Sequence, residues 1–241
     1  MQAASAVLVE EKQKRGLRQP PDVAPNGTGM IGPEYTALTT TLGDVTSKRT
    51  TTNPDFAAAL ARQLASLDLP RGATALIVLS GSFVGGDVAA IAAVEALGLK
   101  PVLVSSLGSS MWGATYPEFN LLDILAVLRA RGVIAAKSVV AALGGESGVG
   151  RDMDPAGIAA LRAAAARDGV PLIELRPLRA LLEALMERVS AAAGGATPAV
   201  AINIGGALIG TGSCRESYEF PPGLTKAALS CTGGTPGLVM R

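Results

Sequence analysis

Serine and glycine gather in three segments that each follow a short apolar run, and these residue types suit ligand chemistry. The segments are SGSFVGGD at 80–87, SSLGSSMWG at 105–113 and NIGG at 203–206. Glycine lets the backbone approach a ligand closely, and a serine hydroxyl adds a hydrogen-bond donor. At the start of a helix, free N–H groups and the helix dipole favour a carboxylate or a phosphate. The candidate binding residues are Ser80, Gly81, Ser82, Ser105, Ser106, Ser109, Ser110, Asn203, Gly205 and Gly206.

Two adjacent cations and the single tryptophan complete the candidate binding residues. Lys48 and Arg49 lie in a threonine-rich segment, where they either clamp anionic groups or belong to an ordinary solvated loop. Trp112 follows the second serine segment and either faces a ligand or packs against other side chains. Tight turns also use glycine and serine for geometry alone, so a structural role for the loops stays open.

The sequence has no histidine, which restricts the catalytic mechanisms open to a serine. A Ser-His-Asp triad, a Cys-His pair and a histidine zinc site are excluded within this chain. A nucleophilic Ser82 or Ser110 would need Lys48 or a carboxylate as its base, with glycine-turn N–H groups for the oxyanion. No P-loop, dinucleotide fingerprint or Gly-x-Ser-x-Gly elbow is present, so we expect no cofactor and no metal.

The elements that must position these turns alternate between strand and helix from residue 53 onward. Helices are expected to begin near Pro54, Asp87, Leu121, Pro155 and Pro177, and five apolar runs predict strands over 73–79, 101–104, 138–143, 170–175 and 199–204. The alternation predicts an α/β fold, a three-layer α/β/α domain with a mainly parallel, doubly wound sheet. Right-handed crossovers place the strand-to-helix turns along one edge, where such folds bind ligands.

The chain divides into an N-terminal part and one α/β domain. Residues 1–53 are predicted to be a polar helix followed by an irregular Gly/Pro/Thr-rich connection, and 54–241 to be a single domain. Cys214 and Cys231 lie 17 residues apart and form either a disulfide or two unpaired thiols.

Charge and composition exclude two classes of partner. The net charge is +1 and aromatic residues make up 3%, so the basic, aromatic-lined surface of a nucleic-acid binder is absent. No run of about 18 apolar residues is present, so we expect the chain itself to be soluble. The Ser/Gly-rich turns then leave a small anionic ligand, with a carboxylate or a phosphate, as the expected partner.

Seven motifs together resemble the family known as poly-γ-glutamate system protein. They are GTGMIG at 27–32, LTTTLGD at 38–44, KRTTTNP at 48–54, SGSF at 80–83, SSMWGA at 109–114, ALGG at 142–145 and NIGG at 203–206. The resemblance covers most of the chain. It implies an accessory role in making or exporting poly-γ-glutamate, beside a polymer-synthesising membrane complex. It also implies a location outside the cytoplasm, through an N-terminal anchor that this sequence does not contain.

Three functional hypotheses follow from the motifs and the resemblance. The first is an accessory protein that binds γ-glutamyl carboxylates at the Ser/Gly-rich loops with help from Lys48 and Arg49. The second is a serine-based amide hydrolase or transferase that acts on the same polymer. The third is a phosphosugar-binding module, because Ser80-Gly81-Ser82 and the later Ser105-Ser106 are similar to the phosphate loops of sugar isomerase domains.

Overall fold

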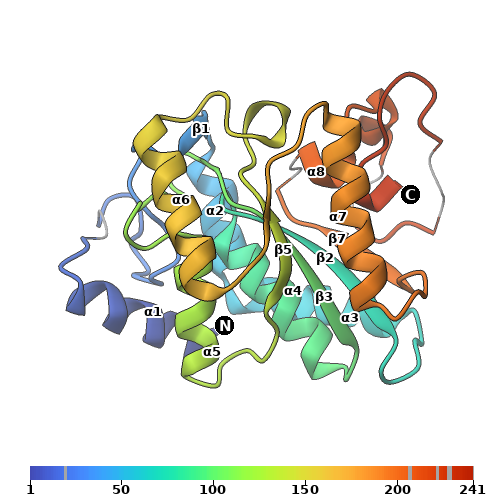
Figure 1. Ribbon diagram of the computed structural model, residues 1–241. Coiled ribbons are helices and arrows are strands. Elements are labelled where there is room, and N and C mark those ends of the chain that lie inside the picture. Colours follow the sequence, from blue (N-terminus) through green and yellow to red (C-terminus); the bar gives the residue numbers. More distant parts are fainter. Residues whose placement is uncertain (19–20, 206–207, 221–222, 227–229, 241) are drawn as a thin grey trace.

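A five-stranded parallel sheet forms the centre of the molecule, as the computed structural model shows (Figure 1). The structure describes residues 1–18, 21–205, 208–220, 223–226 and 230–240. The spatial order of the strands is β6-β5-β3-β2-β7, and each neighbouring pair is parallel. The strands are β2 Thr74–Ser80, β3 Lys100–Ser106, β5 Ser138–Ala142, β6 Leu172–Ile173 and β7 Val200–Asn203. The expected α/β fold with a mainly parallel five-stranded sheet is confirmed.

Helices cover both faces of the sheet because the buried strands alternate apolar side chains between the two faces. In β2, Ala75, Ile77 and Leu79 pack into one core, and Leu76 and Val78 pack into the other. The first core includes side chains from α3 Pro54–Ala65, α4 Val84–Ala96, α5 Leu121–Ala130 and α6 Pro155–Asp168. The second core is covered by α7 Leu178–Ala192, α8 Leu208–Thr211 and the 3-10 turn η3 Leu238–Met240. Figure 1 shows the strands between α6 and α7.

The strand order reverses beside β2, and this reversal defines where a ligand site is expected. From β2 the chain moves outward through β3, β5 and β6, and then crosses to the opposite side of β2 to form β7. Open α/β sheets bind ligands at the carboxyl ends of the strands where the order reverses. In this molecule that point lies between Ser80, the last residue of β2, and Asn203, the last residue of β7.

The N-terminal part is more ordered than the sequence predicted. The connection between the first helix and residue 54 was expected to be irregular, but it contains β1 Thr39–Thr41 and α2 Val45–Thr52. Asp44 caps α2 by accepting from the backbone N–H groups of Thr46 and Ser47. The three threonines that end α2 each donate their hydroxyl to a backbone carbonyl three or four residues earlier, so these hydroxyls are satisfied within the helix.

Residues before 54 also share the core of the α/β domain. The first helix, α1 Gln2–Lys14, packs on α5 and buries Leu8, and Ile31 and Leu38 are also fully buried. β1 pairs in parallel with β4 Ser109–Ser110 in a second, two-stranded sheet. The N-terminal part and the domain are therefore packed together through both contacts.

The expected helix ends are confirmed at three caps, and one helix start was misplaced. Asn53 and Asp154 cap α3 and α6 with proline in the first turn, and Gly169 ends α6 in the left-handed conformation. α4 begins at Val84, three residues before the expected Asp87. Two further 3-10 turns are η1 Glu146–Gly148 and η2 Arg215–Glu219. In the part of the chain described by the structure, no helix is long and apolar enough to cross a membrane.

Candidate functional site

The small sheet of β1 and β4 places the second serine segment against the threonine-rich segment. After β3 the chain turns at Leu107 and Gly108 and forms β4, which pairs Ser109 with Thr39 and Ser110 with Thr41. α2 begins a few residues after β1. Lys48 and Ser110, which lie 62 residues apart in the sequence, are thereby brought into contact.

Lys48 is the centre of the site. Its side chain is 2% exposed, and its Nζ lies 2.8 Å from Ser110 Oγ. Nζ also donates to the backbone carbonyl of Ser82 and lies 4.4 Å from the centre of the Phe83 ring. The amine therefore bonds two oxygens and faces an aromatic ring, in a position largely closed to water.

Burial changes the acid–base chemistry of Lys48. Desolvation disfavours the charged amine and lowers the pKa of Lys48 to about 8, although Asp44 and Asp87 raise it. With that pKa, about a tenth of the amine is neutral at pH 7. A neutral amine that touches a serine hydroxyl can accept its proton, which is the arrangement of a nucleophile and its base.

Ser82 and Ser110 were both candidate nucleophiles, and the structure gives them different environments. Ser110 Oγ contacts the Lys48 amine directly. Ser82 Oγ instead accepts from the backbone N–H of Ser110 at 2.9 Å, and only its carbonyl meets Lys48. Of the two, Ser110 is the serine whose hydroxyl has a base within hydrogen-bond reach.

Gly43 covers the Lys48–Ser110 pair, and the sequence analysis did not select it. A Cβ at residue 43 would lie 3.1 Å from Lys48 Cε, 3.2 Å from Ser110 Oγ and 2.9 Å from the Met111 carbonyl oxygen. A larger residue would therefore push the backbone away from the pair. In the sequence, Gly43 is part of Leu-Gly-Asp, between β1 and the Asp44 cap of α2. From the sequence alone, this tripeptide indicates only an ordinary turn.

Asp87 is a second residue that the sequence analysis missed as a functional candidate. It lies in the first turn of α4, is fully buried, and accepts from the Ser80 N–H at 3.0 Å through Oδ1. Its Oδ2 is buried without a hydrogen-bond partner among the described residues. Burial raises the pKa of Asp87 well above its usual range, against the opposing effects of the Ser80 N–H and Lys48.

The turn at 80–83 is already satisfied by the protein, which differs from the anion cradle expected for it. All four backbone N–H groups of the turn donate to protein oxygens. The acceptors are the Asp87 carboxyl, the Ser106 carbonyl and, within the turn, the hydroxyl and carbonyl of Ser80. An anion at this turn would have to displace these bonds and approach a buried carboxyl group.

Several predicted binding residues make contacts within the protein. Arg49 points away from the serine loops, because its guanidinium donates to the backbone carbonyls of Asp22 and Val23 at 2.6 Å. Ser105 is fully buried and shares a hydrogen bond with Ser138. Ser106 is buried in β3 beneath Gly144, where a Cβ would come within 2.5 Å of its hydroxyl.

Three further candidates lie in the segments next to Ser82 and Ser110 and contact the backbone there. The Ser109 hydroxyl is fully buried and donates to the carbonyl of Gly81 at 2.9 Å, which joins β4 to the turn after β2. Gly81 must be glycine, since a Cβ there would lie 2.5 Å from the Leu107 carbonyl oxygen. Trp112 is half-buried, has a positive φ of 60°, and its backbone N–H donates to the Pro33 carbonyl.

The third Ser/Gly segment lies at the strand-order reversal but outside the Lys48 site. Asn203 is half-buried beside Gly210, and its Oδ1 is buried without a partner among the described residues. Gly205 adopts a φ of 75° and lies against Ser80 and Phe83, with a Cβ position 2.7 Å from the Phe83 ring. Gly206 was also predicted to bind a ligand and lies outside the described residues.

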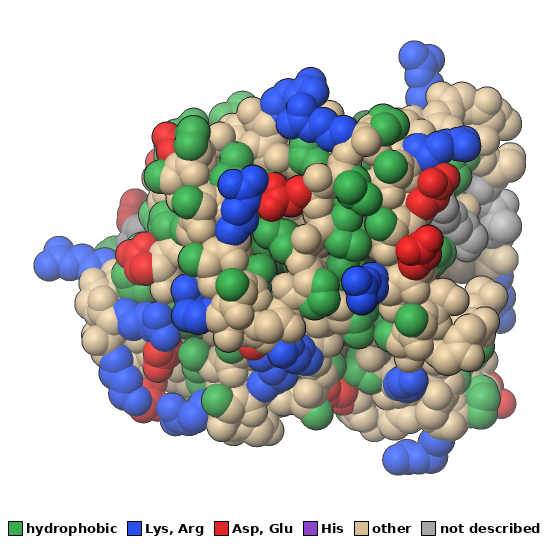
Figure 2. Space-filling view, viewed as in Figure 1, with side chains coloured by type: hydrophobic (Ala, Val, Ile, Leu, Met, Phe, Trp, Pro, Cys, Tyr) green, Lys and Arg blue, Asp and Glu red, His purple; other side chains and the backbone are tan. Residues whose placement is uncertain are grey.

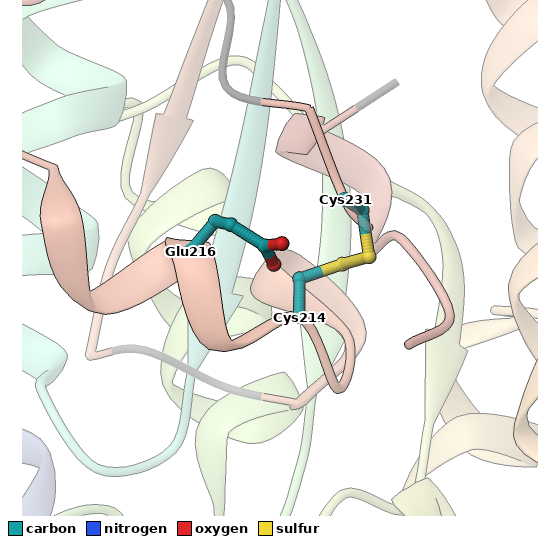
Figure 3. Close-up of side chains that lie close together, drawn as sticks. All are labelled: Cys214, Glu216 and Cys231. Atoms are coloured by element: carbon teal, nitrogen blue, oxygen red, sulfur yellow. A yellow bond between two sulfur atoms is a disulfide. The ribbon is translucent and has the colours of Figure 1, made fainter. Parts of the chain in front are cut away.

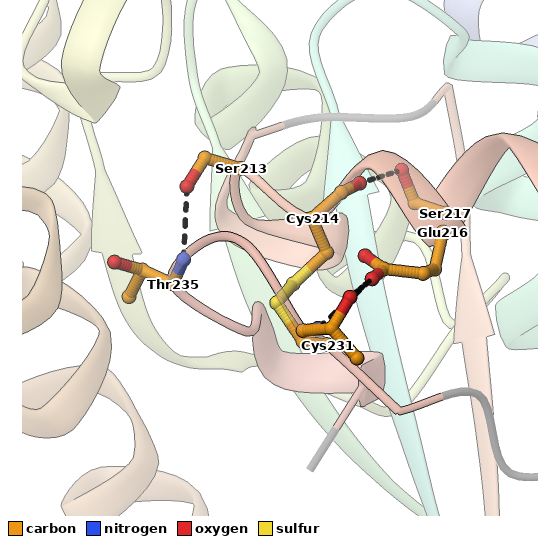
Figure 4. The surroundings of a disulfide bond; sticks show 7 residues. Ser213, Cys214, Glu216, Ser217, Cys231 and Thr235 are labelled. Carbon is orange, nitrogen blue, oxygen red and sulfur yellow. Dashed lines mark hydrogen bonds between the residues drawn. A yellow bond between two sulfur atoms is a disulfide. The ribbon is translucent and has the colours of Figure 1, made fainter.

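Cys214 and Cys231 form a disulfide, which decides between the two alternatives left open by their spacing (Figure 3). Glu216 lies close to the two sulfur atoms, as a metal-binding group would require. Its carboxylate accepts from the backbone N–H of Thr232 at 2.9 Å, and the Thr232 hydroxyl also donates to it. Figure 4 shows a second connection nearby, from the Thr235 N–H to the Ser213 hydroxyl. While the cysteines are bonded to each other, they offer no thiolate ligands, and the cluster cross-links the C-terminal segment.

Comparison with family models finds no match, and neither the curated proteins nor the solved structures contain a match to the chain.

Proposed function

We propose that this protein is a serine–lysine amide hydrolase or transferase that acts on poly-γ-glutamate in the accessory machinery of that polymer. The observation that carries the proposal is the 2.8 Å contact between the buried Lys48 amine and Ser110 Oγ. The expected binding mode, with Lys48 and Arg49 as a free cationic clamp, is less well supported. Lys48 already bonds two protein oxygens, and Arg49 faces another part of the chain.

The proposed reaction has two steps with Lys48 as the proton carrier. Ser110 Oγ adds to the amide carbonyl while its proton moves to neutral Lys48, and the C–N bond then breaks as Lys48 returns the proton to the leaving amine. The product is an ester between the polymer and Ser110. In the second step the oxygen of water, or the amine nitrogen of another chain, adds to the ester carbonyl while its proton moves to Lys48. The ester C–O bond then breaks as Lys48 returns the proton to Ser110 Oγ, which gives the hydrolysed or the transferred chain.

The polymer is suggested by the motif resemblance, and two of the quoted motifs supply the reacting pair. KRTTTNP contains Lys48 and SSMWGA contains Ser110. A third motif, LTTTLGD, contains Gly43, which lies against both side chains. Residues that are distant in the sequence but grouped by the resemblance therefore meet at one place in the fold. The same resemblance suggests proximity to the membrane complex that makes the polymer.

The disulfide supports the proposed location outside the cytoplasm. Disulfides persist in oxidising compartments and are rare in the cytosol. Cys214 and Cys231 are bonded with a Cα–Cα distance of 5.3 Å, in the usual range for such a bond.

The experiment that tests the function follows the chain length of poly-γ-glutamate by size-exclusion chromatography. We expect the wild-type protein to shorten the polymer or to transfer its chains to an added amine. Ser110→Ala and Lys48→Met should each remove this activity, whereas Ser190→Ala and Lys14→Met, changes at exposed positions, should not. Activity that survives in Ser110→Ala would refute Ser110 as the nucleophile, and no activity in the wild type would refute the proposed reaction.

A further inference from the structure

A cavity of about 450 Å³ lies away from the Lys48–Ser110 pair and has a cationic lining. Its walls come from the loop after β5 and from the start of α7. The lining residues are Ser147, Arg151, Arg176, Pro177 and Leu178. No acidic residue is among them, so the fixed charges on the wall are the two guanidinium groups.

The two arginines differ in how far they are already neutralised. Arg151 pairs with Glu146 at 3.3 Å on the exposed side of the loop. Arg176 has no hydrogen bond or ion pair with any described residue, so its guanidinium is free to bind a ligand. Arginine binds carboxylate and phosphate groups through two parallel hydrogen bonds, so this pair of residues selects an anion.

The start of α7 adds to the positive character of the cavity. Pro177 is the N-cap of this 15-residue helix and provides no side-chain cap, and the first turn contains no acidic residue. The positive end of the helix dipole is therefore not neutralised by its own sequence. Figure 2 shows a group of Lys and Arg side chains at the upper centre of this face, where Figure 1 places the loop after β5 and the beginning of α7.

A second cavity has an uncharged lining, in contrast to the cationic cavity. It has a volume of about 250 Å³ and lies between α7, β7 and the C-terminal turn η3. Its lining contains no Lys, Arg, Asp or Glu. The lining residues are Leu76, Met186, Val189, Ser190, Gly195, Ala196, Thr197, Pro198, Ala201, Leu238 and Val239. The cationic cavity is thus the better candidate for an anionic ligand.

The cationic cavity lies along the same edge of the sheet as the Lys48–Ser110 pair. The loop after β5 forms one wall of the cavity through Ser147, and the same loop packs against the chain that leads into β4. At Gly108, a Cβ would lie 3.0 Å from the Leu143 carbonyl oxygen and 2.9 Å from Thr40 of β1. The cavity and the Lys48–Ser110 pair are therefore formed by neighbouring loops that follow the carboxyl ends of β5 and β3.

We propose that Arg176 and Arg151 form a binding site for the free carboxylates of a γ-glutamyl chain, which holds the polymer while Ser110 reacts with it. This inference rests on the proposed function for the identity of the chain. A γ-linked glutamate polymer has one free carboxylate on each residue, so a chain presents carboxylates to the arginines and an amide bond to Ser110. The ligand class is a chain of carboxylates, in contrast to a single phosphate group.

Calorimetric titration of a γ-glutamate oligomer into the Ser110→Ala protein tests this site without turnover. We expect saturable binding that weakens as salt is raised, because the contacts are ionic. Arg176→Gln should weaken binding about tenfold, as expected for the loss of a charged hydrogen-bonding partner. Arg188→Gln is the matched control, because it removes an exposed charge from α7, the helix that follows Arg176, outside the cavity.

Three results would overturn the site. Equal affinity in Arg176→Gln and the parent protein would show that the cavity does not hold the chain. An equal loss in Arg188→Gln would show a general charge effect. Binding of inorganic phosphate, but not of the oligomer, that depends on Arg176 would assign the cavity to a phosphorylated ligand. If the oligomer binds through Arg176 but the wild-type protein does not shorten the polymer, the carboxylate site stands and the proposed reaction fails.

Discussion

Lys48 combines burial with a hydrogen bond to a serine, and this combination makes the reaction depend on pH. Its pKa is lowered to about 8, so the neutral amine that accepts the Ser110 proton becomes scarcer as pH falls. We expect kcat/KM for polymer cleavage to rise with pH and to level off above about 8. At pH 6 it should be about a hundredfold below the plateau. The pH profile measures this directly, and a flat profile between pH 6 and 9 would remove Lys48 as the base.

Lys12 is a second buried lysine, and it affects stability instead of chemistry. Its Nζ donates to the Ile31 carbonyl at 2.9 Å and lies 5.3 Å from the centre of the Tyr116 ring, while burial lowers the pKa of Lys12 to about 7. The lysine of the unfolded chain keeps a pKa near 10.5. At a pH between about 7 and 10.5, Lys12 binds more protons in the unfolded state than in the folded state. The contribution of Lys12 to the unfolding free energy therefore increases as the pH rises through this range.

Replacing Lys12 with methionine should therefore remove the part of the unfolding free energy that changes with pH through this lysine. We expect the unfolding free energy of the wild type, relative to Lys12→Met, to increase from pH 7 to pH 10 by a few kcal/mol at most. Urea unfolding at several pH values measures it, and Lys14→Met is the control because Lys14 is exposed on the same helix. A wild-type advantage that stays constant across this range would contradict the shifted pKa.

The turn between β1 and α2 is the element that holds the reacting pair together. Gly43→Ala should move this turn, because its Cβ would meet Lys48 and Ser110 at less than ordinary contact distance. We expect a loss of stability of about 1–2 kcal/mol and a much larger relative loss of cleavage activity. Thermal unfolding and the polymer assay separate the two effects.

The control for this substitution is Gly233→Ala, because a Cβ at Gly233 meets no atom within 4 Å and its φ is not positive. Gly233→Ala should keep both stability and activity. Unchanged activity in Gly43→Ala would mean that the turn does not need to cover the pair.

The C-terminal segment is held by a disulfide that closes a short loop. Cys214 and Cys231 are 17 positions apart in the sequence. For a disulfide-closed loop of this length, the chain-entropy model gives about 3 kcal/mol of stabilisation. We expect the Cys214→Ser/Cys231→Ser protein to be cleaved faster by protease within residues 215–230, with the sheet still folded. Mass spectrometry of the fragments tests this, and identical cleavage in both proteins would show that the disulfide does not restrain this segment.

At the scale of elements, sequence periodicity was informative where a strand or helix is long and buried. The apolar runs before Ser80 and Ser106 predicted two of the central strands, and proline after Asn53 and Asp154 predicted two helix starts. Periodicity did not predict α2, because a run of threonines has a low helix propensity and carries no apolar repeat. Nor did it show that residues 107–108 lead the chain into a second sheet.

The sequence alone predicted some of the residues that belong to the candidate site, but it did not predict which of them contact one another. Lys48, Ser82 and Ser110 were selected from the sequence, and they meet because β4 pairs with β1, a long-range contact that local pattern does not encode. Arg49 was selected for the same reasons and points elsewhere, because adjacent residues of a helix face different directions. Asp87 and Gly43 became visible only from their burial and close approach.

At the scale of the whole molecule, a net charge of +1 cannot attract a polyanion by itself. Affinity for a γ-glutamyl chain must then come from local charge, and the cationic cavity is a local source on the same sheet edge as Ser110. We expect KM for cleavage to fall as substrate length increases until a chain reaches both the cavity and Ser110. In Arg176→Gln the length dependence should weaken while kcat for long chains stays close to that of the wild type. If KM does not depend on length in the wild type, the cavity and the reacting pair do not bind the same chain, and each would have to be assigned its own ligand.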